Sequence, residues 1–445
     1  MRIAVIGAGI SGLGAAWLLN RAGHEVAVYE QNRRAGGHAN TVEAPGIGGR
    51  AVPVDAGFIV YNESTYPNLT ALFDHLQVPT DRCSMSFAVS VDRGRLEYAG
   101  RNVAGMFAQK RNLLSPGYHL MLRDILRFYK VAPKLLADPD RADLTLGEFL
   151  VQQSYGHRFI YDHLLPMGAA IWSGTVADML AFPAQSFVRF FHNHGLLKLK
   201  ARPQWRTVRG GSREYVSRLL AELRGPVHTG RAISALIRGP GGVTVADAEG
   251  LSATYDHVVV ATHADQALAL LADATEEEKQ VLGAFRSISN RAVLHRDPAL
   301  MPVRPKAWSS WNYLANATRE RAAKVSITYW MNALQNIDRR SPLFLTLNPI
   351  QEPRQELKLR EFIYDQPMLD GPAIRAQARI GRIQGRDRIW FCGAYMGYGF
   401  HEDGLSAGLA VAEALGGHRR PWTLLDLSPA GRNARPDPRE REVVG

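Results

Sequence analysis

The chain has few of the residues on which several classes of protein depend. Only two of its 445 residues are cysteine, Cys83 and Cys392, which excludes a disulfide-built secreted scaffold and a cysteine-rich metal site. No apolar run reaches the length of about 18 residues that a membrane-spanning helix needs. Apolar residues make up 46% of the chain, as in an ordinary globular protein, and general disorder is therefore excluded.

Charge is unevenly balanced, with a formal net value of +11. Between Arg101 and Lys134 seven basic residues stand against a single acid, Asp124. A local excess of this kind favours an anionic partner: nucleic acid, an acidic membrane surface or an anionic substrate. The chain starts with an apolar strand, Arg2 to Ile6, where a secreted protein would have a charged leader and a cleavable apolar stretch. We therefore expect a cytoplasmic protein.

A nucleotide-binding unit is predicted at the start of the chain. An apolar strand precedes a glycine loop, a helix over residues 13–21 and a second strand that ends at Glu30. Such a loop lets the backbone approach a pyrophosphate, and the helix behind it presents free N–H groups. An acid near the position of Glu30 accepts ribose hydroxyls. A glycine-rich turn without a ligand is the alternative. The predicted nucleotide contacts are Gly7, Gly9, Ser11, Gly12, Glu30 and Gln31.

A second loop, which follows the acid directly, indicates which nucleotide is bound. An arginine and paired glycines come where a nicotinamide enzyme would enter another crossover helix. The guanidinium of Arg34 can contact phosphate, while Gly36 and Gly37 allow close backbone approach. The loop resembles the RxGG element of the flavin-dependent amine oxidase and phytoene desaturase superfamily. The resemblance implies non-covalently bound FAD, with contacts from Arg34, Gly36, Gly37, His38 and Thr41.

Later parts of the chain support this resemblance. Residues 227–237 and 243–247 predict a hairpin, and Tyr255 to Thr262 predicts a buried strand. Ile233 matches the aliphatic position that the superfamily places near the adenine. In the superfamily a late strand leads beneath the isoalloxazine, and a helix N-terminus, with its positive dipole end, faces the ring. The matching residues here are Gly393, Phe400, His401, Glu402 and Gly404, whereas Ala394 replaces the usual acid.

The predicted fold class is α/β, a Rossmann-type FAD-binding domain with an inserted α+β substrate domain that contains an antiparallel sheet. We assign residues 1–60, 205–265 and 380–425 to the FAD-binding domain and residues 61–204 and 266–379 to the substrate domain. The antiparallel sheet rests on four apolar strands and a hairpin, and helices are expected within 117–160. These strands are 291–295, 308–314, 325–331 and 343–348, and the hairpin is 86–100. We expect residues 428–445, rich in proline and charge, to be disordered.

Several longer stretches point to a narrower group. They resemble the bacterial flavoproteins encoded beside cyclopropane-fatty-acyl-phospholipid synthase-like methyltransferases. This resemblance covers about residues 1–420 and implies desaturation of methyl-branched fatty acyl chains on the route to furan fatty acids. It also implies a methyltransferase of that type as a partner. The stretches are 36–41, 55–62, 166–173, 193–197, 308–313 and 399–404.

Flavin dehydrogenation needs a hydride acceptor and often a base for the second hydrogen. Our candidate catalytic residues are His401, which adjoins the closing helix, and Tyr395 on the approach to it. His401 either moves a proton or presents only its backbone N–H to the flavin. The structural interpretation of Glu402 and Asp403, without a role in chemistry, is that they cap the helix they precede. His38, beside the glycine pair, is more typical of packing than of catalysis.

Three other positions have a structural and a functional interpretation. Cys392 lies in a strand, where an inert buried thiol is more typical than a covalent flavin link. His192 and His194 have no acid or cysteine nearby in the sequence, so we expect no metal. Ser212, after paired glycines, predicts an N-cap for a helix that starts at Arg213.

The substrate class stays open between three hypotheses. The first is a lipid acyl chain, for which the run Phe182, Phe187, Phe190 and Phe191 either lines a tunnel or simply packs a core. The second is a small polar amine, oxidised as in the best-known superfamily chemistry. The third is an accessory flavoprotein that holds the methyltransferase at the membrane without turnover. No second GxGxxG occurs, so a dedicated NADPH domain is not expected and the electron acceptor is unspecified.

A helix predicted from Gly117 to Lys134 is our candidate for membrane association. Arg123, Arg127, Lys130 and Lys134 recur at three- and four-residue spacing and share one face. The remainder is largely apolar, with Leu122, Ile125, Phe128, Tyr129 and Ala132. A helix of this kind suits an anionic leaflet, and peripheral association is expected, with phospholipid acyl chains as substrate. The alternative is a core-packed helix with a solvated basic face. Nucleic acid is a weaker partner because no binding motif accompanies the patch.

Overall fold

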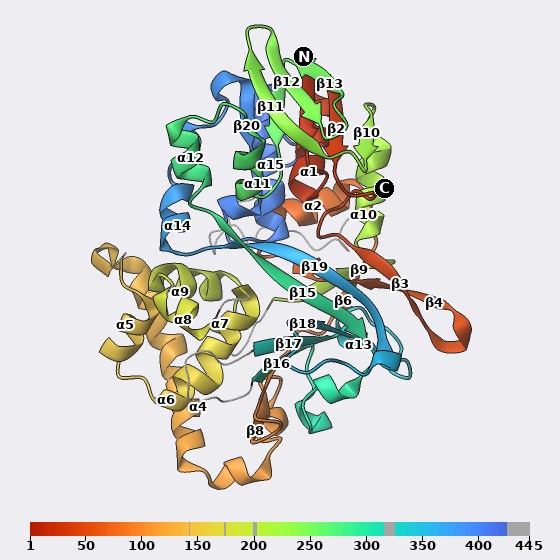
Figure 1. The fold of residues 1–445 in the computed structure, drawn as a ribbon. Coiled ribbons are helices and arrows are strands. Elements are labelled where there is room, and N and C mark those ends of the chain that lie inside the picture. Colours follow the sequence, from red (N-terminus) through yellow and green to blue (C-terminus); the bar gives the residue numbers. More distant parts are fainter. Residues whose placement is uncertain (142, 173–174, 199–202, 316–324, 425–445) are drawn as a thin grey trace, which may run out of the picture.

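Two sheets, one above the other and surrounded by helices, organise the molecule (Figure 1). The structure, a computed structural model, describes residues 1–141, 143–172, 175–198, 203–315 and 325–424. The tail expected to be disordered, residues 428–445, lies outside these ranges. The N-terminus lies beside the upper sheet, and β15 and β19 run from the upper part of the molecule into the lower one.

The upper sheet is parallel and has the strand order β10-β2-β1-β14-β20. Its central strand is buried and almost wholly apolar, as expected for a parallel sheet covered on both faces. The helices nearest to it are α1 (Ile10–Arg21), α10 (Arg213–Glu222) and α15 (His401–Gly416). The strands are β1 (Arg2–Ile6), β2 (Glu25–Glu30), β10 (Val227–Thr229), β14 (His257–Val260) and β20 (Ile389–Phe391).

The predicted hairpin around residues 227–247 is correct only in its second part. Val227–Thr229 pairs in parallel with β2 and belongs to the upper sheet. The antiparallel strands are β11 (Ile233–Gly239), β12 (Gly242–Asp247) and β13 (Ser252–Tyr255). The strand predicted from Tyr255 to Thr262 is therefore divided, because Tyr255 ends β13 and β14 begins two residues later.

The lower sheet has seven strands in the order β19-β15-β18-β17-β16-β7-β8. All neighbours are antiparallel except β16 and β7. The four predicted strands and the predicted hairpin are confirmed, whereas β19 was missed. The strands are β7 (Phe87–Val91), β8 (Leu96–Ala99), β15 (Arg286–His295), β16 (Trp311–Ala315), β17 (Val325–Trp330), β18 (Phe344–Leu347) and β19 (Lys358–Met368).

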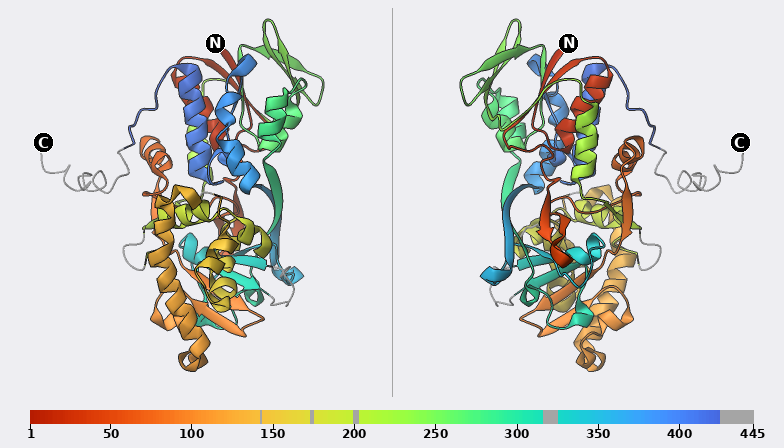
Figure 2. Two further views of the ribbon diagram at one scale, coloured as in Figure 1. Left: turned by 90° about the vertical axis from the view of Figure 1, so that its left-hand side faces the viewer. Right: turned by 90° about the vertical axis from the view of Figure 1, so that its right-hand side faces the viewer.

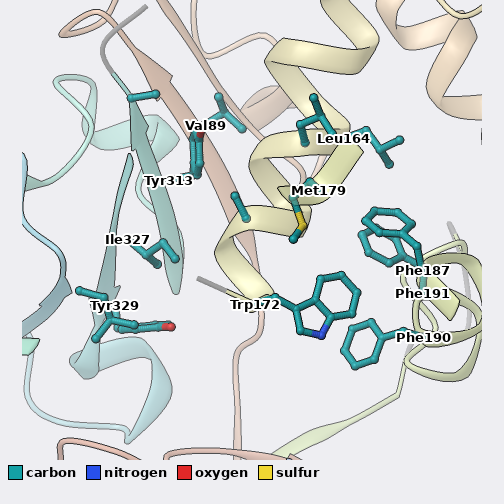
Figure 3. Close-up of a cluster of buried hydrophobic side chains, with 14 of the residues drawn as sticks. Val89, Leu164, Trp172, Met179, Phe187, Phe190, Phe191, Tyr313, Ile327 and Tyr329 are labelled. Carbon is teal, nitrogen blue, oxygen red and sulfur yellow. The ribbon is translucent and has the colours of Figure 1, made fainter. Parts of the chain in front are cut away.

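Helices cover one side of this lower sheet and bury an aromatic cluster against it. Trp172 packs within 4.9 Å of Phe182 and 4.8 Å of Phe190, measured between ring centroids. Figure 3 shows Trp172 near Phe187, Phe190 and Phe191, with Tyr313, Ile327 and Tyr329 on the strands across from them. The helices of this part are α4 (Pro116–Val131), α5 (Leu146–Gln152), α6 (His157–Phe159), α7 (Leu165–Trp172), α8 (Val176–Ala181) and α9 (Ala184–Asn193).

Helix α4 corrects the predicted membrane-facing surface. Ile125, Phe128 and Ala132, expected on an exposed apolar face, are 6%, 0% and 0% exposed and pack into the core. Arg127 donates to the Ser154 carbonyl at 3.1 Å and lies over the Tyr155 ring. These three residues thus hold α4 to the protein, whereas Leu120 and Leu126, which are 51% and 52% exposed, lie on its solvent side. None of the described helices is both long and apolar enough to cross a membrane.

Asp55 joins several elements at the boundary between the two sheets. It ends β4 (Ala51–Asp55), which pairs with β3 (Thr41–Pro45). Its carboxylate accepts hydrogen bonds from the Thr41 hydroxyl at 2.6 Å, the Ser212 N–H at 2.9 Å and the Gln335 side-chain amide at 2.9 Å. Ser212 is therefore not the predicted side-chain cap of α10, because its hydroxyl donates to Asp55 at 2.7 Å.

The remaining short elements connect these layers. A small sheet of β5, β9 and β6 contributes Cys83 and Trp205 to the lining of the cavity described below. The strands and helices are β5 (Tyr61–Asn62), α2 (Pro67–His75), β6 (Thr80–Cys83), α3 (Val103–Met106), β9 (Trp205–Val208), α11 (Ala264–Leu270), α12 (Glu276–Leu282), α13 (Met331–Leu334) and α14 (Gly371–Gln377).

A buried histidine in the lower sheet predicts an acid-dependent stability. The His295 ring is 0% exposed, and its Nδ1 accepts from the Asp297 N–H at 3.1 Å. Burial lowers the pKa of His295 from 6.5 to about 4. As the pH falls from about 6.5 to about 4, the unfolded chain binds a proton that the folded chain does not, so stability is lost on acidification. We expect this loss to reach about 3 kcal/mol at pH 4.

The substitution His295→Asn keeps an acceptor for Asp297 but cannot titrate in this range. The difference in unfolding free energy between the parent and this variant should therefore shrink by about 3 kcal/mol between pH 7 and pH 4, as measured by denaturant unfolding. The exposed His192, replaced by Asn, is the matched control. A parent–variant difference that stays constant across this range would contradict the prediction.

Candidate active site

A large cavity extends from the carboxyl edge of the parallel sheet to the face of the lower sheet. Its volume is about 1530 Å³, whereas single-ligand pockets are typically about 300–1,000 Å³. The upper part is lined by the glycine loop, the end of β2 and the loop around Arg34. The lower part is lined by aromatic and aliphatic side chains from α7, α9 and the lower sheet. The cavity thus has room for a dinucleotide and a second molecule beside it.

Glycine is needed at the three positions of the first loop for different physical reasons. A Cβ at Gly7 would lie 2.7 Å from the Ala261 carbonyl oxygen, and a Cβ at Gly12 only 1.9 Å from that of Gly7. These two glycines are required by packing within the protein. At Gly9 the backbone is extended, and a Cβ would meet no atom of the chain within 4 Å. Because Gly9 lines the cavity, its lack of a side chain fits the close approach of a phosphate.

The second loop packs directly on the first. The Gly36 N–H donates to the Ala8 carbonyl at 2.7 Å, and a Cβ at Gly37 would lie 3.0 Å from the Gly9 Cα. Gly37 has a φ of +56°, in the region that favours glycine. The Arg34 guanidinium donates to the Ala39 and Gly37 carbonyls at 3.0 and 2.7 Å and lines the cavity. The paired glycines therefore bring a cation to the pyrophosphate-binding edge.

Glu30 is a buried acid at the end of β2, 6% exposed, and it lines the cavity. It accepts the Ala8 N–H at 2.9 Å, and the Asn32 N–H and side-chain amide at 2.9 and 2.8 Å. A carboxylate offers about four acceptor positions, so one position remains for a ribose hydroxyl. Gln31 and Ile233 line the same part of the cavity. The residues predicted to surround the adenosine are thus brought together.

Helix α15 brings a second helix N-terminus to the cavity. A Cβ at Gly404 would lie 2.7 Å from the Ser11 hydroxyl, and one at Gly408 only 2.1 Å from the Ser11 carbonyl oxygen. The two helices can therefore cross only with glycine at these positions. Four of the predicted cofactor contacts line the cavity: Ser11, Gly393, Phe400 and His401. Three others do not line it: Gly12, Gly36 and Gly404.

The two acids at the start of α15 have different partners. The Asp403 carboxylate accepts from the Phe400 N–H at 2.9 Å and so caps its own helix, as the structural interpretation predicts. Glu402 instead accepts the Asn68 and Leu69 N–H groups at 2.9 and 3.0 Å, at the N-terminus of α2. The predicted cap of its own helix is therefore incorrect for Glu402, whose side chain is held by α2 and does not line the cavity. The flavin contact of Glu402 stays a prediction.

His401 lies flat against Phe58, with ring centroids 3.9 Å apart, and its Nε2 is 2.9 Å from the Tyr215 hydroxyl. Burial, and then the nearby His38, lower the pKa of His401 to about 3. The imidazole is therefore neutral at pH 7 and a weak base, which favours a binding role over proton transfer. Tyr395 is 2% exposed with its hydroxyl among buried atoms that have no partner in the described part of the chain. Burial raises its pKa, so its phenol stays protonated.

His38 and Thr41 line the cavity from the second loop. The His38 ring lies 5.2 Å from Tyr364 of β19, and burial lowers the pKa of His38 to about 4. Asn40 donates to the Tyr364 hydroxyl at 2.7 Å. The Thr41 hydroxyl is held by Asp55, so Thr41 presents mainly its remaining atoms to the cavity. The contribution of β19 was missed because the pattern around Tyr364 alternates only weakly.

The lower part of the cavity is an apolar chamber. It is lined by Met167, Ile171, Trp172, Phe190, Trp311, Tyr329, Leu345 and Leu347. The indole N–H groups of Trp172 and Trp311 are buried without a partner among the described residues. Of the four phenylalanines with two interpretations, only Phe190 lines the chamber, whereas Phe182, Phe187 and Phe191 pack behind it. The two tryptophans stood in conspicuous sequence stretches, but nothing in those stretches indicated a shared chamber.

Two other candidates have structural roles: Cys392 lies outside the cavity lining, whereas His194 is part of that lining. Cys392 is 0% exposed, burial raises its thiol pKa to about 12, and it does not line the cavity. The His194 Nδ1–H donates to the Phe190 carbonyl at 3.0 Å, and burial lowers the pKa of His194 to about 4. Among the described residues, no group of three potential ligands is arranged to hold a metal.

The glycine loop, the second helix N-terminus and the large second compartment together define a dinucleotide-binding oxidoreductase. The profile of the family of flavin containing amine oxidoreductases matches residues 10–295, and the chain belongs to this family. It is accordingly an FAD-dependent oxidoreductase of the amine oxidase and desaturase type. The open space at Gly9, the cation of Arg34 and the free acceptor position of Glu30 fit FAD.

Named relatives differ in chemistry. A Mycobacterium tuberculosis protein named as a flavin-containing monoamine oxidase, AofH, is 27% identical over 277 residues, 58% of this chain and 56% of the relative. The chain thus spans little more than half the length of that relative. A 4,4'-diapophytoene desaturase of Staphylococcus aureus is 48% identical over 47 residues, 11% of this chain and 9% of that protein.

Solved structures share the fold over nearly the whole chain. The CLA-producing fatty acid isomerase from P. acnes has a TM-score of 0.64 at 17% identity, covering 93% of this chain and 97% of that one. Putrescine oxidase bound to putrescine has a TM-score of 0.64 at 16% identity, with coverages of 93% and 99%. At these identities the likeness shows the fold, including the α/β architecture with its antiparallel sheet.

Replacing Gly9 by valine should abolish FAD binding and leave the protein folded. The backbone conformation tolerates a side chain and no protein atom lies in its way, so only the cofactor is excluded. We expect the flavin absorbance per protein to fall at least tenfold, with an unchanged far-UV circular dichroism spectrum. Gly381→Val, at an exposed glycine that likewise has nothing within 4 Å, is the matched control. Flavin retained in Gly9→Val at the parent's stoichiometry would show that the pyrophosphate lies elsewhere.

Proposed function

We propose that the enzyme dehydrogenates a methyl-branched fatty acyl chain, which it binds in the apolar chamber beside the FAD site. The observation that carries this proposal is the chamber itself, whose lining is aromatic and aliphatic. A long hydrocarbon chain gains most by leaving water for such a surface. The resemblance to flavoproteins encoded beside cyclopropane-synthase-like methyltransferases supports the same substrate class.

The polar groups of the chamber favour a lipid over an amine. The lining residues from α7, α9 and β16 to β18 include no Asp or Glu, so a cationic amine would find no carboxylate on these elements. Asp365 of β19 also lines the cavity, and its carboxylate accepts a hydrogen bond from the Ser289 hydroxyl.

The residues of the chain bind and orient, and they exclude water. When bound, FAD supplies the hydride acceptor for the two-electron oxidation. Phe400 stacks on Phe190 with centroids 5.1 Å apart, so the residue before α15 is continuous with the chamber wall. His401 keeps its ring against Phe58 and Tyr215. This apolar wall would hold a saturated chain against the flavin-binding end and keep water from it.

Two alternatives follow from the same fold. Oxidation of a small amine is favoured by the family to which the chain belongs, and aromatic walls can also hold cations. A role as a flavin-bearing accessory subunit of a lipid methyltransferase is the other. We retain the methyltransferase as a proposed partner, because it would supply the methyl-branched chains that this enzyme consumes.

Anaerobic titration of the FAD-bound protein separates these functions. Addition of phospholipid or free fatty acid with methyl-branched acyl chains should bleach the flavin absorbance near its long-wavelength maximum, whereas putrescine and benzylamine should not. Straight-chain lipids test whether the branch is required. Bleaching by the amines alone would replace the proposal with amine oxidation, and no bleaching by either would favour the accessory role.

Filling the chamber should remove lipid oxidation and leave FAD bound. Met167 lines the chamber from α7 and is only partly buried, so Met167→Trp places a larger ring in the substrate compartment. We expect flavin reduction by the acyl substrate to slow at least tenfold, with the flavin content unchanged. Met167→Leu, which conserves volume, is the control. Equal rates in both variants would show that the chain does not pass Met167.

A further inference from the structure

We propose that the end of the molecule remote from the parallel sheet is a docking surface for an anionic phospholipid bilayer. We call this surface the basic tip and define it by four exposed apolar residues and four exposed basic residues. It comprises Val103, Leu113, Leu114 and Leu120 with Arg101, Lys110, Arg111 and Arg123. The inference rests on the proposed function for its lipid substrate, but it concerns a different part of the protein.

The apolar residues of the basic tip are unusually exposed. Leu114 is 89% exposed and Val103 is 75% exposed, while Leu113 and Leu120 are 52% and 51% exposed. They come from one stretch of chain that forms α3, the short helix η2 (Lys110–Leu114) and the first turns of α4. The orange segment at the foot of the molecule in both views of Figure 2 is this region.

The apolar residues are presented by an ordered scaffold. The Tyr118 hydroxyl donates to the Met106 carbonyl at 2.5 Å, which joins α4 to α3. His119 lies 2.8 Å from the Leu113 carbonyl, and the Ser115 hydroxyl caps α4 at the Tyr118 N–H. Tyr118 and Asn112, which flank the exposed leucines in the sequence, are themselves buried. Leu113 and Leu114 are therefore held outward by the packing of their neighbours.

The electrostatic surroundings of the basic tip suit an anionic surface. From Arg93 to Ala137 the only acids are Glu97 and Asp124, and they are 0% and 3% exposed. Glu97 pairs with Arg304 at 2.8 Å, and Asp124 pairs with Arg127 at 3.2 Å. No acid of this stretch therefore faces solvent beside the exposed cations. Exposed leucines among cations match the interface of a bilayer that contains anionic lipid.

The cavity approaches the inner side of the same segment. Tyr98 and the exposed Gly100 line it, and Arg101 of the basic tip follows Gly100 directly. The Tyr98 ring also packs on Tyr118, with centroids 6.1 Å apart. A phospholipid acyl chain leaves a bilayer only at a cost that grows with every exposed CH₂ group. Docking at this end would bring the chamber close to the membrane and shorten the exposed path.

The test uses the full-length, FAD-bound protein and co-sedimentation with two kinds of vesicle. One contains phosphatidylglycerol with phosphatidylcholine, and the other contains phosphatidylcholine alone. We expect binding to the anionic vesicles, weakened by high salt, and at least tenfold weaker binding to the neutral ones. Leu113→Ser with Leu114→Ser should lower anionic-vesicle binding about tenfold, and Arg101→Glu with Lys110→Glu should do the same.

Matched controls change exposed residues outside the basic tip, in the turn between β12 and β13 and in the turn between β3 and β4. These are Leu251→Ser, at a side chain that is 59% exposed, and Arg50→Glu. Both should bind vesicles as the parent does. Parent-like binding by both tip variants, or no binding by the parent, overturns the inference. If the parent is a dimer that Leu113→Ser with Leu114→Ser makes monomeric in sedimentation velocity, the surface is covered by a second copy and the membrane inference is overturned.

A second readout separates this inference from the proposed function. The tip variants should lose flavin reduction by vesicle lipid but retain it with the same acyl chain dispersed in detergent. Vesicle binding that depends on the basic tip, without flavin reduction by any lipid, supports the docking surface and contradicts the proposed function. Reduction by the dispersed chain without vesicle binding does the reverse.

Discussion

The close crossing of α1 and α15 is the constraint on which the site depends. Ser11 lies against Gly404 and Gly408, where a Cβ would meet its hydroxyl and carbonyl oxygens at 2.7 and 2.1 Å. Side chains at either glycine would push the helices apart. Because they cross so closely, both N-termini border one cavity at the carboxyl edge of the parallel sheet, and both can stabilise negative charge there.

The second organising feature is the junction between the sheets. Asp55 connects the β3–β4 hairpin, the start of α10 and Gln335 of the lower part through hydrogen bonds of 2.6 to 2.9 Å. Strands β15 and β19 extend between the upper and lower parts, and the Asn40 side chain, which follows the second loop, donates to the Tyr364 hydroxyl of β19. The flavin site and the chamber are thereby fixed relative to each other. The shared fold supports several chemistries, so the chamber lining has to carry the argument about substrate.

The cofactor half could largely be predicted because its signals are local. The strand, glycine loop, helix and terminal acid occur within the first 30 residues, and their spacing alone predicts a βαβ unit. The partners of polar side chains could not be predicted in the same way. The Glu402 carboxylate caps α2 by accepting the Asn68 backbone N–H, 334 positions away, and Ser212 binds Asp55 instead of capping its own helix. A capping pattern in the sequence cannot show that folding brings a distant residue close enough to bind the same side chain.

By itself the sequence determined the dinucleotide-binding unit, the strands of the lower sheet other than β19, and the concentration of positive charge up to residue 134. Only the tertiary structure decided which face of each amphipathic segment is covered. It buried Ile125 and Phe128 of α4 and left Leu113 and Leu114 exposed, although all four are equally apolar. It also placed Phe190 on the chamber wall and Phe187 behind it. The physical reason is that periodicity specifies a face, whereas the packing of distant elements specifies what lies against that face.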